Sequence, residues 1–418
     1  MRFGSKGFNS VLKWSVAMWR LGFFFHEMGF GLLSIFLPLY ILTIGGSLVD
    51  VGVMSAAALF LAIPASFLWG YICDKTRRYK RYVLLSFLSS TLLLYVFTLA
   101  TRMNMLILLY AILSFLHVAH EPPKNVLIAE LYSRQDWERS FAFYEGFTEA
   151  GWLIGLVLGF LTSIYGFHPD ATLLLCAVLN LAAFVLSLFL VTDPLLVFER
   201  RLVNIERSTD FACRGVFIAS RLLDGTQVNE RLRKENVAAF CTGLVLFSLA
   251  TSILFTPMPI FVSKVAASAS LSSSIVFAIF VLNSGGAVLG YTLAGRRSNR
   301  STGKTNIGRI VAFRGLLSLM LVLFAYIENP LYNVTLVTTV LILMGFAYAL
   351  FLVYMLSLSM ELIPSGKAGL FNVLIGIGGA CGSFIGPFIA AQTVGFTGVF
   401  IIAGAIFFIA YLTFKIFA

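Results

Sequence analysis

The sequence has few charged residues and little of the chemistry that builds most enzyme sites. Charged residues make up 12% of its 418 positions, whereas 59% of the positions are apolar. Soluble domains average ~25% charged and ~45–50% apolar residues, so a water-soluble globule is excluded. The five cysteines are scattered without CxxC or paired spacing and therefore predict neither a disulfide framework nor a metal site, and we expect no cofactor; they are Cys73, Cys176, Cys213, Cys241 and Cys381.

Long apolar runs recur along almost the whole chain, which is the pattern of a polytopic membrane protein. The first run is too long for a cleavable signal peptide and has no small-residue cleavage site, so we expect it to be retained. We therefore predict an all-α fold with twelve transmembrane helices, near residues 15–43, 50–73, 82–101, 104–132, 139–166, 170–193, 237–263, 270–295, 307–327, 331–361, 365–394 and 396–416.

The net charge of +11 has a topological explanation. Of the 30 Lys and Arg residues, 26 fall on one side: at the N-terminus, in the loops after the second, fourth, eighth and tenth predicted helices, in the central polar interval and near the C-terminus. Only Arg102 and Lys264 lie on the opposite side. An excess of Lys and Arg marks the cytoplasmic side, so both termini are expected there, with the protein in the cell (plasma) membrane. Contacts with anionic membrane lipids fit this pattern, and a nucleic-acid partner is not expected.

The two halves of the chain resemble each other. Gly155 and Gly159 in the fifth predicted helix recur as Gly382 and Gly386 in the eleventh. The segment GYICDKTRR at the end of the second helix recurs as GYTLAGRR at the end of the eighth, in the same order. A duplicated six-helix unit predicts an N-terminal bundle (1–195), a cytoplasmic linker (196–236) and a C-terminal bundle (237–418). Such bundles enclose one site near the bilayer midplane and rock to alternate access to it.

Several segments resemble the major facilitator superfamily. Gly70–Arg81 (GYICDKTRRYKR) is similar to the signature of its loop between helices 2 and 3, and Gly382–Pro387 is similar to its helix 11. Ile128–Leu131 looks like the end of its helix 4. The chain departs from the family at Arg77, where glycine is usual, and at Ala294, where the second copy would have aspartate.

The resemblance implies a gate on the cytoplasmic side. The aspartate that matches Asp74 would sit against the N-terminus of helix 11, where a carboxylate gains ~0.3–1 kcal/mol. The arginine that matches Arg78 would pair with the acid that matches Glu130. The alternative is that this cluster only sets the topology.

Ionisable residues inside predicted spans indicate a cavity or a partner, because burying them alone is costly. Helix 4 carries such residues on one face, interrupted by two prolines that predict a kink, and helix 5 carries two acids on one face. The candidates for proton coupling or for the cavity are Glu27, His117, Glu121, Lys124, Glu145 and Glu149, whereas His26 is expected to serve in packing.

Depth along the helices predicts how these charges pair. At ~1.5 Å per residue, Lys124 lies about 12 Å into helix 4, between the levels of Glu145 (about 9 Å) and Glu149 (about 15 Å) on helix 5. A Lys124 pair with either acid is expected, which leaves Glu121 and Glu27 as first candidates for a proton carrier, since adjacent carboxylates in a low dielectric cannot all stay ionised. Alternatively, Glu145 and Glu149 are solvated and Lys124 only joins the two helices.

The second half is predicted to be nearly free of buried charge, with Arg314 near a cytoplasmic helix end. Its candidates for a substrate cavity are Asn283, Tyr348, Tyr354 and Asn372. The glycine repeats are expected to be packing surfaces.

Together these features predict a secondary transporter, not an enzyme, that moves a small organic solute by alternating access. Proton coupling is preferred, and efflux is preferred to uptake because the second half is apolar and aromatic. Proton-coupled or facilitated uptake of a sugar or organic acid stays open, as do a membrane-embedded enzyme, a lipid-handling protein and a non-transporting sensor. Gly303-Lys304-Thr305 lacks the first glycine and preceding strand of a phosphate loop, so ATP-driven transport is unsupported. A monomer is expected.

Overall fold

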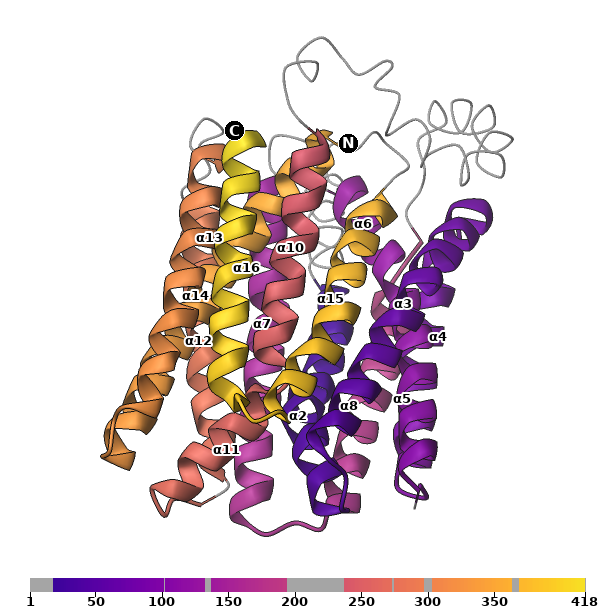
Figure 1. The fold of residues 1–418 in the computed structure, drawn as a ribbon. Helices are drawn as coiled ribbons and strands as arrows, with labels where there is room; N and C mark the ends of the chain where they lie inside the picture. Colours follow the sequence, from indigo (N-terminus) through magenta and orange to yellow (C-terminus); the bar gives the residue numbers. More distant parts are fainter. Residues whose placement is uncertain are drawn as a thin grey trace, which may run out of the picture.

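A computed structural model describes the backbone of most of the chain and shows a bundle of long helices (Figure 1). The described residues are 18–100, 102–131, 137–193, 237–272, 274–296, 303–362 and 368–417. Within these ranges every regular element is a helix, and twelve segments are long and apolar enough to cross a membrane. The predicted all-α fold with twelve spans is therefore confirmed. The predicted linker lies outside the described residues.

The helices form two successive sets along the chain. The first half contains α2 (Arg20–Thr43), α3 (Leu48–Thr76), α4 (Tyr79–Phe97), α5 (Met103–His117), η1 (Val118–His120), α6 (Glu121–Leu131), α7 (Trp137–Ile164) and α8 (Pro169–Leu190). The second half contains α10 (Val237–Phe255), α11 (Met258–Ser268), α12 (Ser274–Arg296), α13 (Gly303–Met320), η4 (Leu321–Ala325), α14 (Pro330–Leu362), α15 (Ala368–Ala390) and α16 (Gly395–Phe417).

Three of the predicted spans are interrupted. The fourth is divided into α5, the 3₁₀ turn η1 and α6, directly before Pro122 and Pro123. The seventh is divided into α10 and α11 at Pro257, and the ninth ends in the 3₁₀ turn η4. Proline removes a backbone donor and clashes with the preceding turn, so the first two interruptions follow from the sequence.

Glycines bring equivalent helices of the two halves into close contact. In the first half, a Cβ at Gly151 would lie 2.6 Å from the carbonyl oxygen of Phe24, so α7 lies directly against α2. In the second half, a Cβ at Gly382 would overlap the carbonyl oxygen of Leu249, so α15 lies directly against α10 in the same way. The predicted packing role of the glycine repeats is confirmed, and both halves use it between corresponding helices.

The halves contact each other mainly through two helix pairs, α7 with α12 and α3 with α15, with smaller contacts such as that of α14 with α7. At Gly52 on α3, a Cβ would lie 3.0 Å from the Cβ of Pro387 on α15. At Gly146 on α7, a Cβ would lie 3.2 Å from the Cβ of Tyr291 on α12. Figure 1 shows α7 and α12 side by side in the middle of the bundle. Side chains on these helices are therefore placed at the junction between the two halves.

The departure from the family pattern at Arg77 has a backbone consequence. Arg77 caps the end of α3 with φ 55°, the left-handed conformation, and its N–H donates to the carbonyl of Cys73. Glycine adopts this conformation without the steric cost that a Cβ brings. The glycine usual at this position would therefore suit the observed turn.

Candidate functional site

A row of polar contacts lies inside the first half, next to the break in the fourth span. At the 3₁₀ turn η1, the N–H of Glu121 donates to Val118, and this frees the carbonyl of His117 from its helical partner. That carbonyl accepts a hydrogen bond from Ser86 Oγ on α4 (2.8 Å) and contacts His120 Nδ1 (2.6 Å). The break thus leaves a carbonyl inside the membrane domain that can accept hydrogen bonds from other groups, at the kink that the two prolines predict.

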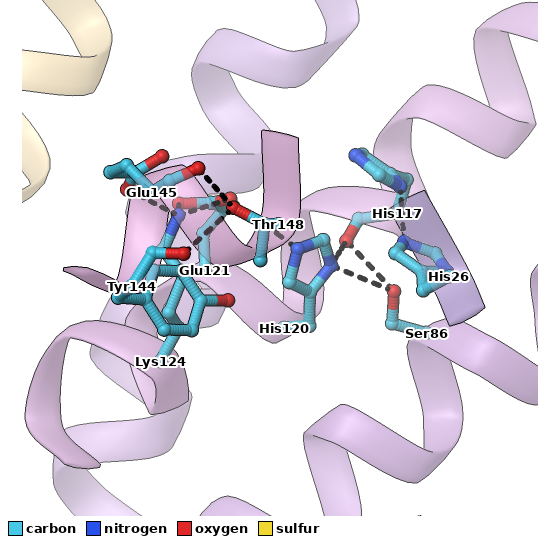
Figure 2. A network of polar contacts seen from close by, with 9 residues as sticks. All are labelled: His26, Ser86, His117, His120, Glu121, Lys124, Tyr144, Glu145 and Thr148. Atoms are coloured by element: carbon cyan, nitrogen blue, oxygen red, sulfur yellow. Dashed lines mark hydrogen bonds and ion pairs between the residues drawn. The ribbon is translucent and has the colours of Figure 1, made fainter. Parts of the chain in front are cut away.

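Glu121, Lys124 and Glu145 form an ion cluster next to this turn (Figure 2). Lys124 Nζ lies 2.7 Å from Glu121 Oε2 and 3.9 Å from Glu145 Oε1. The other face of Glu121 meets His120, whose Nε2 lies 3.3 Å from Glu121 Oε1. The Lys124–Glu145 pair is therefore present, but Lys124 lies closest to Glu121, which the sequence reasoning left without a cation.

Glu149 does not pair with Lys124 and reaches across the junction of the two halves. The hydroxyl of Ser284 on α12 donates a 2.6 Å hydrogen bond to Glu149 Oε1 on α7. Ser284 is buried and Glu149 is partly buried, so the contact is shielded from bulk water. Of the two expected alternatives for the Lys124 pair, the structure has Glu145 and not Glu149, because Glu149 lies one turn further along α7 and faces α12.

Glu27 on α2 completes the set of acids. Its side chain is partly buried and lies within electrostatic range of Lys124, Glu121 and Glu145. Among the described residues, no hydrogen bond or ion pair involves its carboxyl group. One lysine thus faces several carboxylates, as the sequence predicts, with Glu27 and Glu149 as the acids that Lys124 does not contact directly.

Three histidines continue the row on the other side of the turn (Figure 2). His26 on α2 is fully buried and contacts Asn180 Oδ1 (2.6 Å) and His117 Nδ1 (3.0 Å). A ring nitrogen from each of His26, His117 and His120 lies within 4.8 Å of the others, so the trio could hold a transition metal. Sequence spacing did not indicate the trio because His26 comes from a different helix.

The candidates in the second half are not gathered in one place. Asn283 donates a 2.6 Å hydrogen bond to the carbonyl of Leu341 and so joins α12 to α14. Tyr354 lines a cavity of about 280 Å³ between α12, α13 and α14, together with Arg309 and Phe313. Tyr348 lies on another face of α14, 6.5 Å from the ring of Phe247.

Four further candidates come from the sequence: Asp74, Arg78 and Glu130 for the gate, and Asn372 for the substrate cavity. The structure describes the backbone of Asp74, Glu130 and Asn372 but not their side chains, whereas Arg78 is exposed between α3 and α4. The gate therefore remains an expectation.

Arg314 on α13 corrects the expectation of a second half almost free of buried charge. It lies eleven residues after the start of α13, which is about 16 Å along the helix. Its side chain is fully buried among aromatic rings. The sequence reasoning missed it because it judged depth from the helix end and could not place the surrounding helices.

The fold and the buried charges define a polytopic membrane transporter. The family model described as Major Facilitator Superfamily matches residues 21–374, and the chain belongs to this family. It is a transporter and not an enzyme. The resemblance seen in its motifs is thereby confirmed, while the subfamily stays open.

Solved structures with the same fold are distant in sequence. One similar structure is the nucleoside transporter NupG, with a TM-score of 0.68, 15% identity and coverage of 96% of this chain and 98% of that one. Another is the human organic anion transporter MFSD10 (TETRAN), with a TM-score of 0.66, 15% identity and the same coverages. A search of curated protein sequences found no match.

Proposed function

We propose that this chain is a proton-coupled secondary transporter that moves a small organic solute by alternating access. The observation that carries the proposal is the hydrogen bond from Ser284 to Glu149, because it joins an ionisable group in one half to the other half. Both termini would face the cytoplasm of the cell membrane, in accord with the distribution of Lys and Arg. The protein would act as a monomer, with protons and one solute as its partners.

A proton on Glu149 would change the contact between the halves. The ionised carboxylate accepts a strong, charge-assisted hydrogen bond from Ser284, whereas the neutral acid accepts a weaker one. Tyr291 lies on the same helix as Ser284 and packs on Gly146, and Glu145 lies one turn before Glu149 on α7. Protonation would therefore weaken the junction at a point where α7 and α12 must move if the halves rock.

Glu27 is the second candidate carrier. The pairing of Glu121 with Lys124 and His120 makes Glu121 a poorer carrier than the sequence suggests, since a bound cation keeps a carboxylate ionised. We assign Glu121, Lys124 and Glu145 to an ion cluster whose charge pairing changes when Glu27 gains or loses a proton. His117 belongs to the neighbouring histidine row.

The direction of transport and the class of solute are inferred from the character of the second half. The second half presents an apolar and aromatic interior, which favours efflux of a partly apolar solute. Uptake of a sugar or organic acid, coupled to protons or facilitated, is the alternative, and it has the support that NupG and MFSD10 are described as nucleoside and organic anion transporters.

Proteoliposomes that contain a pH-sensitive dye test the coupling. We expect solute-dependent proton flux in the wild type and its loss in Glu149→Gln and Glu27→Gln, while solute exchange without a pH gradient continues. Glu328→Gln is the matched control, because Glu328 is exposed between η4 and α14. Unchanged proton flux in both glutamate variants would refute the assignment, and solute flux independent of pH would indicate facilitated diffusion.

A further inference from the structure

The second half contains a buried cation, Arg314, that is not part of the proposed proton-coupling site. Arg314 is 0% exposed, and none of its three guanidinium-group nitrogens has a hydrogen-bond partner within the part of the chain that the structure describes. A guanidinium carries five N–H donors and no acceptor, so it needs oxygen atoms from elsewhere. An isolated buried cation is among the most costly groups that a fold can contain.

Aromatic rings from three helices surround the guanidinium. The centre of the group lies 5.0 Å from the ring of Phe247 and 5.6 Å from that of Phe255, both on α10. The rings of Tyr348 on α14 and Phe407 on α16 each lie 5.3 Å away. Cation–π attraction from these rings offsets part of the desolvation cost. Ring faces do not accept the in-plane N–H groups, so the donors stay unsatisfied.

A second unsatisfied donor lies on the same face of α10. Thr251 follows Phe247 by four residues and precedes Phe255 by four, which places it on the helix face that packs against Arg314. Its hydroxyl oxygen is buried and has no hydrogen-bond partner among the described residues. Two independent groups, a guanidinium and a hydroxyl, thus carry buried hydrogen-bond donors without partners at the same cluster of aromatic rings.

We propose that Arg314 and Thr251 bind the carboxylate of a small organic anion, with the surrounding rings packed on its apolar part. A carboxylate takes two parallel hydrogen bonds from a guanidinium and has further lone pairs for a hydroxyl. This proposal rests on the proposed function in one respect, that the chain carries a solute, and it names the class of that solute.

The aromatic cluster around Arg314 extends towards the first half through Tyr348. Tyr348 is only partly buried, and its helix α14 contacts α7 of the first half. A solute between the halves would reach Arg314 when the rings of Tyr348 and Phe247 turn aside. Phe247 also stacks on Phe351, with ring centroids 3.5 Å apart, so this stack would have to change when the ring of Phe247 moves.

Ligand binding to the purified protein in detergent tests the proposal without any proton gradient. The probes are benzoate and benzamide, which share a shape and differ in charge, and phenyl phosphate as a second kind of anion. We expect calorimetry to show binding of benzoate at least tenfold tighter than binding of benzamide. Arg314→Met should abolish this preference, Arg314→Lys should restore part of it, and Thr251→Val should weaken benzoate binding several-fold.

Thermal unfolding without ligand supplies a second readout and a folding check. Methionine fills an aromatic pocket without an unsatisfied charge, so we expect Arg314→Met to unfold at the same or a higher temperature than the wild type. Lys415→Gln is the matched control, because Lys415 is an exposed cation on α16 of the same half, and this variant should bind benzoate as the wild type does.

Several results would overturn the proposal. These are equal affinity for benzoate and benzamide, no binding of either, retention of benzoate binding in Arg314→Met, or binding of phenyl phosphate in place of benzoate. Since binding is measured at one pH and without transport, a failure of proton coupling would leave this result intact.

Discussion

The ion pair between Lys124 and Glu121 offers the most quantitative prediction. Replacing Lys124 with methionine removes the cation that lies 2.7 Å from Glu121 and 3.9 Å from Glu145. Glu121 and Glu145 then lose the lysine that they share. We expect the variant to fold with reduced stability.

The magnitude follows from the distances and the burial. Unit charges ~4 Å apart attract by about 4 kcal/mol at an effective dielectric constant of ~20. The side chains of Lys124 and Glu121 are 13% and 26% exposed, so the pair is neither at the surface, where ~0–1 kcal/mol is usual, nor fully buried, where breaking a pair costs ~3–5 kcal/mol. We expect a loss of about 3 kcal/mol.

A double-mutant cycle isolates the pair. The free energy of unfolding is measured in mixed micelles by SDS titration for Lys124→Met, Glu121→Gln and the double variant. We expect a coupling energy of about 2 kcal/mol, because the double variant removes both the cation and one of the acids that need it. Lys264→Met is the control, since Lys264 is exposed, and it should change stability by less than about 1 kcal/mol.

The pair also predicts a dependence on pH. Its contribution requires an ionised carboxylate, so it is present at neutral pH and is lost as the pH falls and Glu121 takes up a proton. The deficit of Lys124→Met relative to the wild type should therefore shrink on acidification. A coupling energy below about 0.5 kcal/mol, or a deficit that grows towards low pH, would refute the reasoning.

Two further predictions concern the backbone and the packing of the helices. Gly155→Ala should destabilise the protein by about 1–3 kcal/mol because the new methyl group would overlap the carbonyl of Met28. Gly285→Ala is the control and should be neutral or stabilising, because the nearest atom to the new methyl group lies 3.9 Å away. Thermal unfolding of both variants measures the difference, and equal shifts in unfolding temperature would contradict the packing argument. Arg77→Gly should stabilise the end of α3 by about 1 kcal/mol, because glycine adopts φ 55° without steric cost; an unchanged or lower unfolding temperature would contradict this.

The sequence by itself determined the number of spans, the interruption at Pro122 and Pro123 and the packing role of the glycine repeats. These features depend on hydropathy and on short-range backbone geometry, which are properties of consecutive residues. The family followed from motifs that are also local.

Only the tertiary structure decided which charges meet. Depth along a helix placed Lys124 level with two acids of α7, but the rotation of α7 turns Glu149 towards Ser284 on α12, while the turn η1 brings Glu121 to Lys124. His26 on α2 contacts His117 on α5. Arg314 on α13 is enclosed because α10, α14 and α16 place aromatic rings around its guanidinium group. Such contacts depend on how helices far apart in the sequence are rotated and packed, and no property of consecutive residues contains that information.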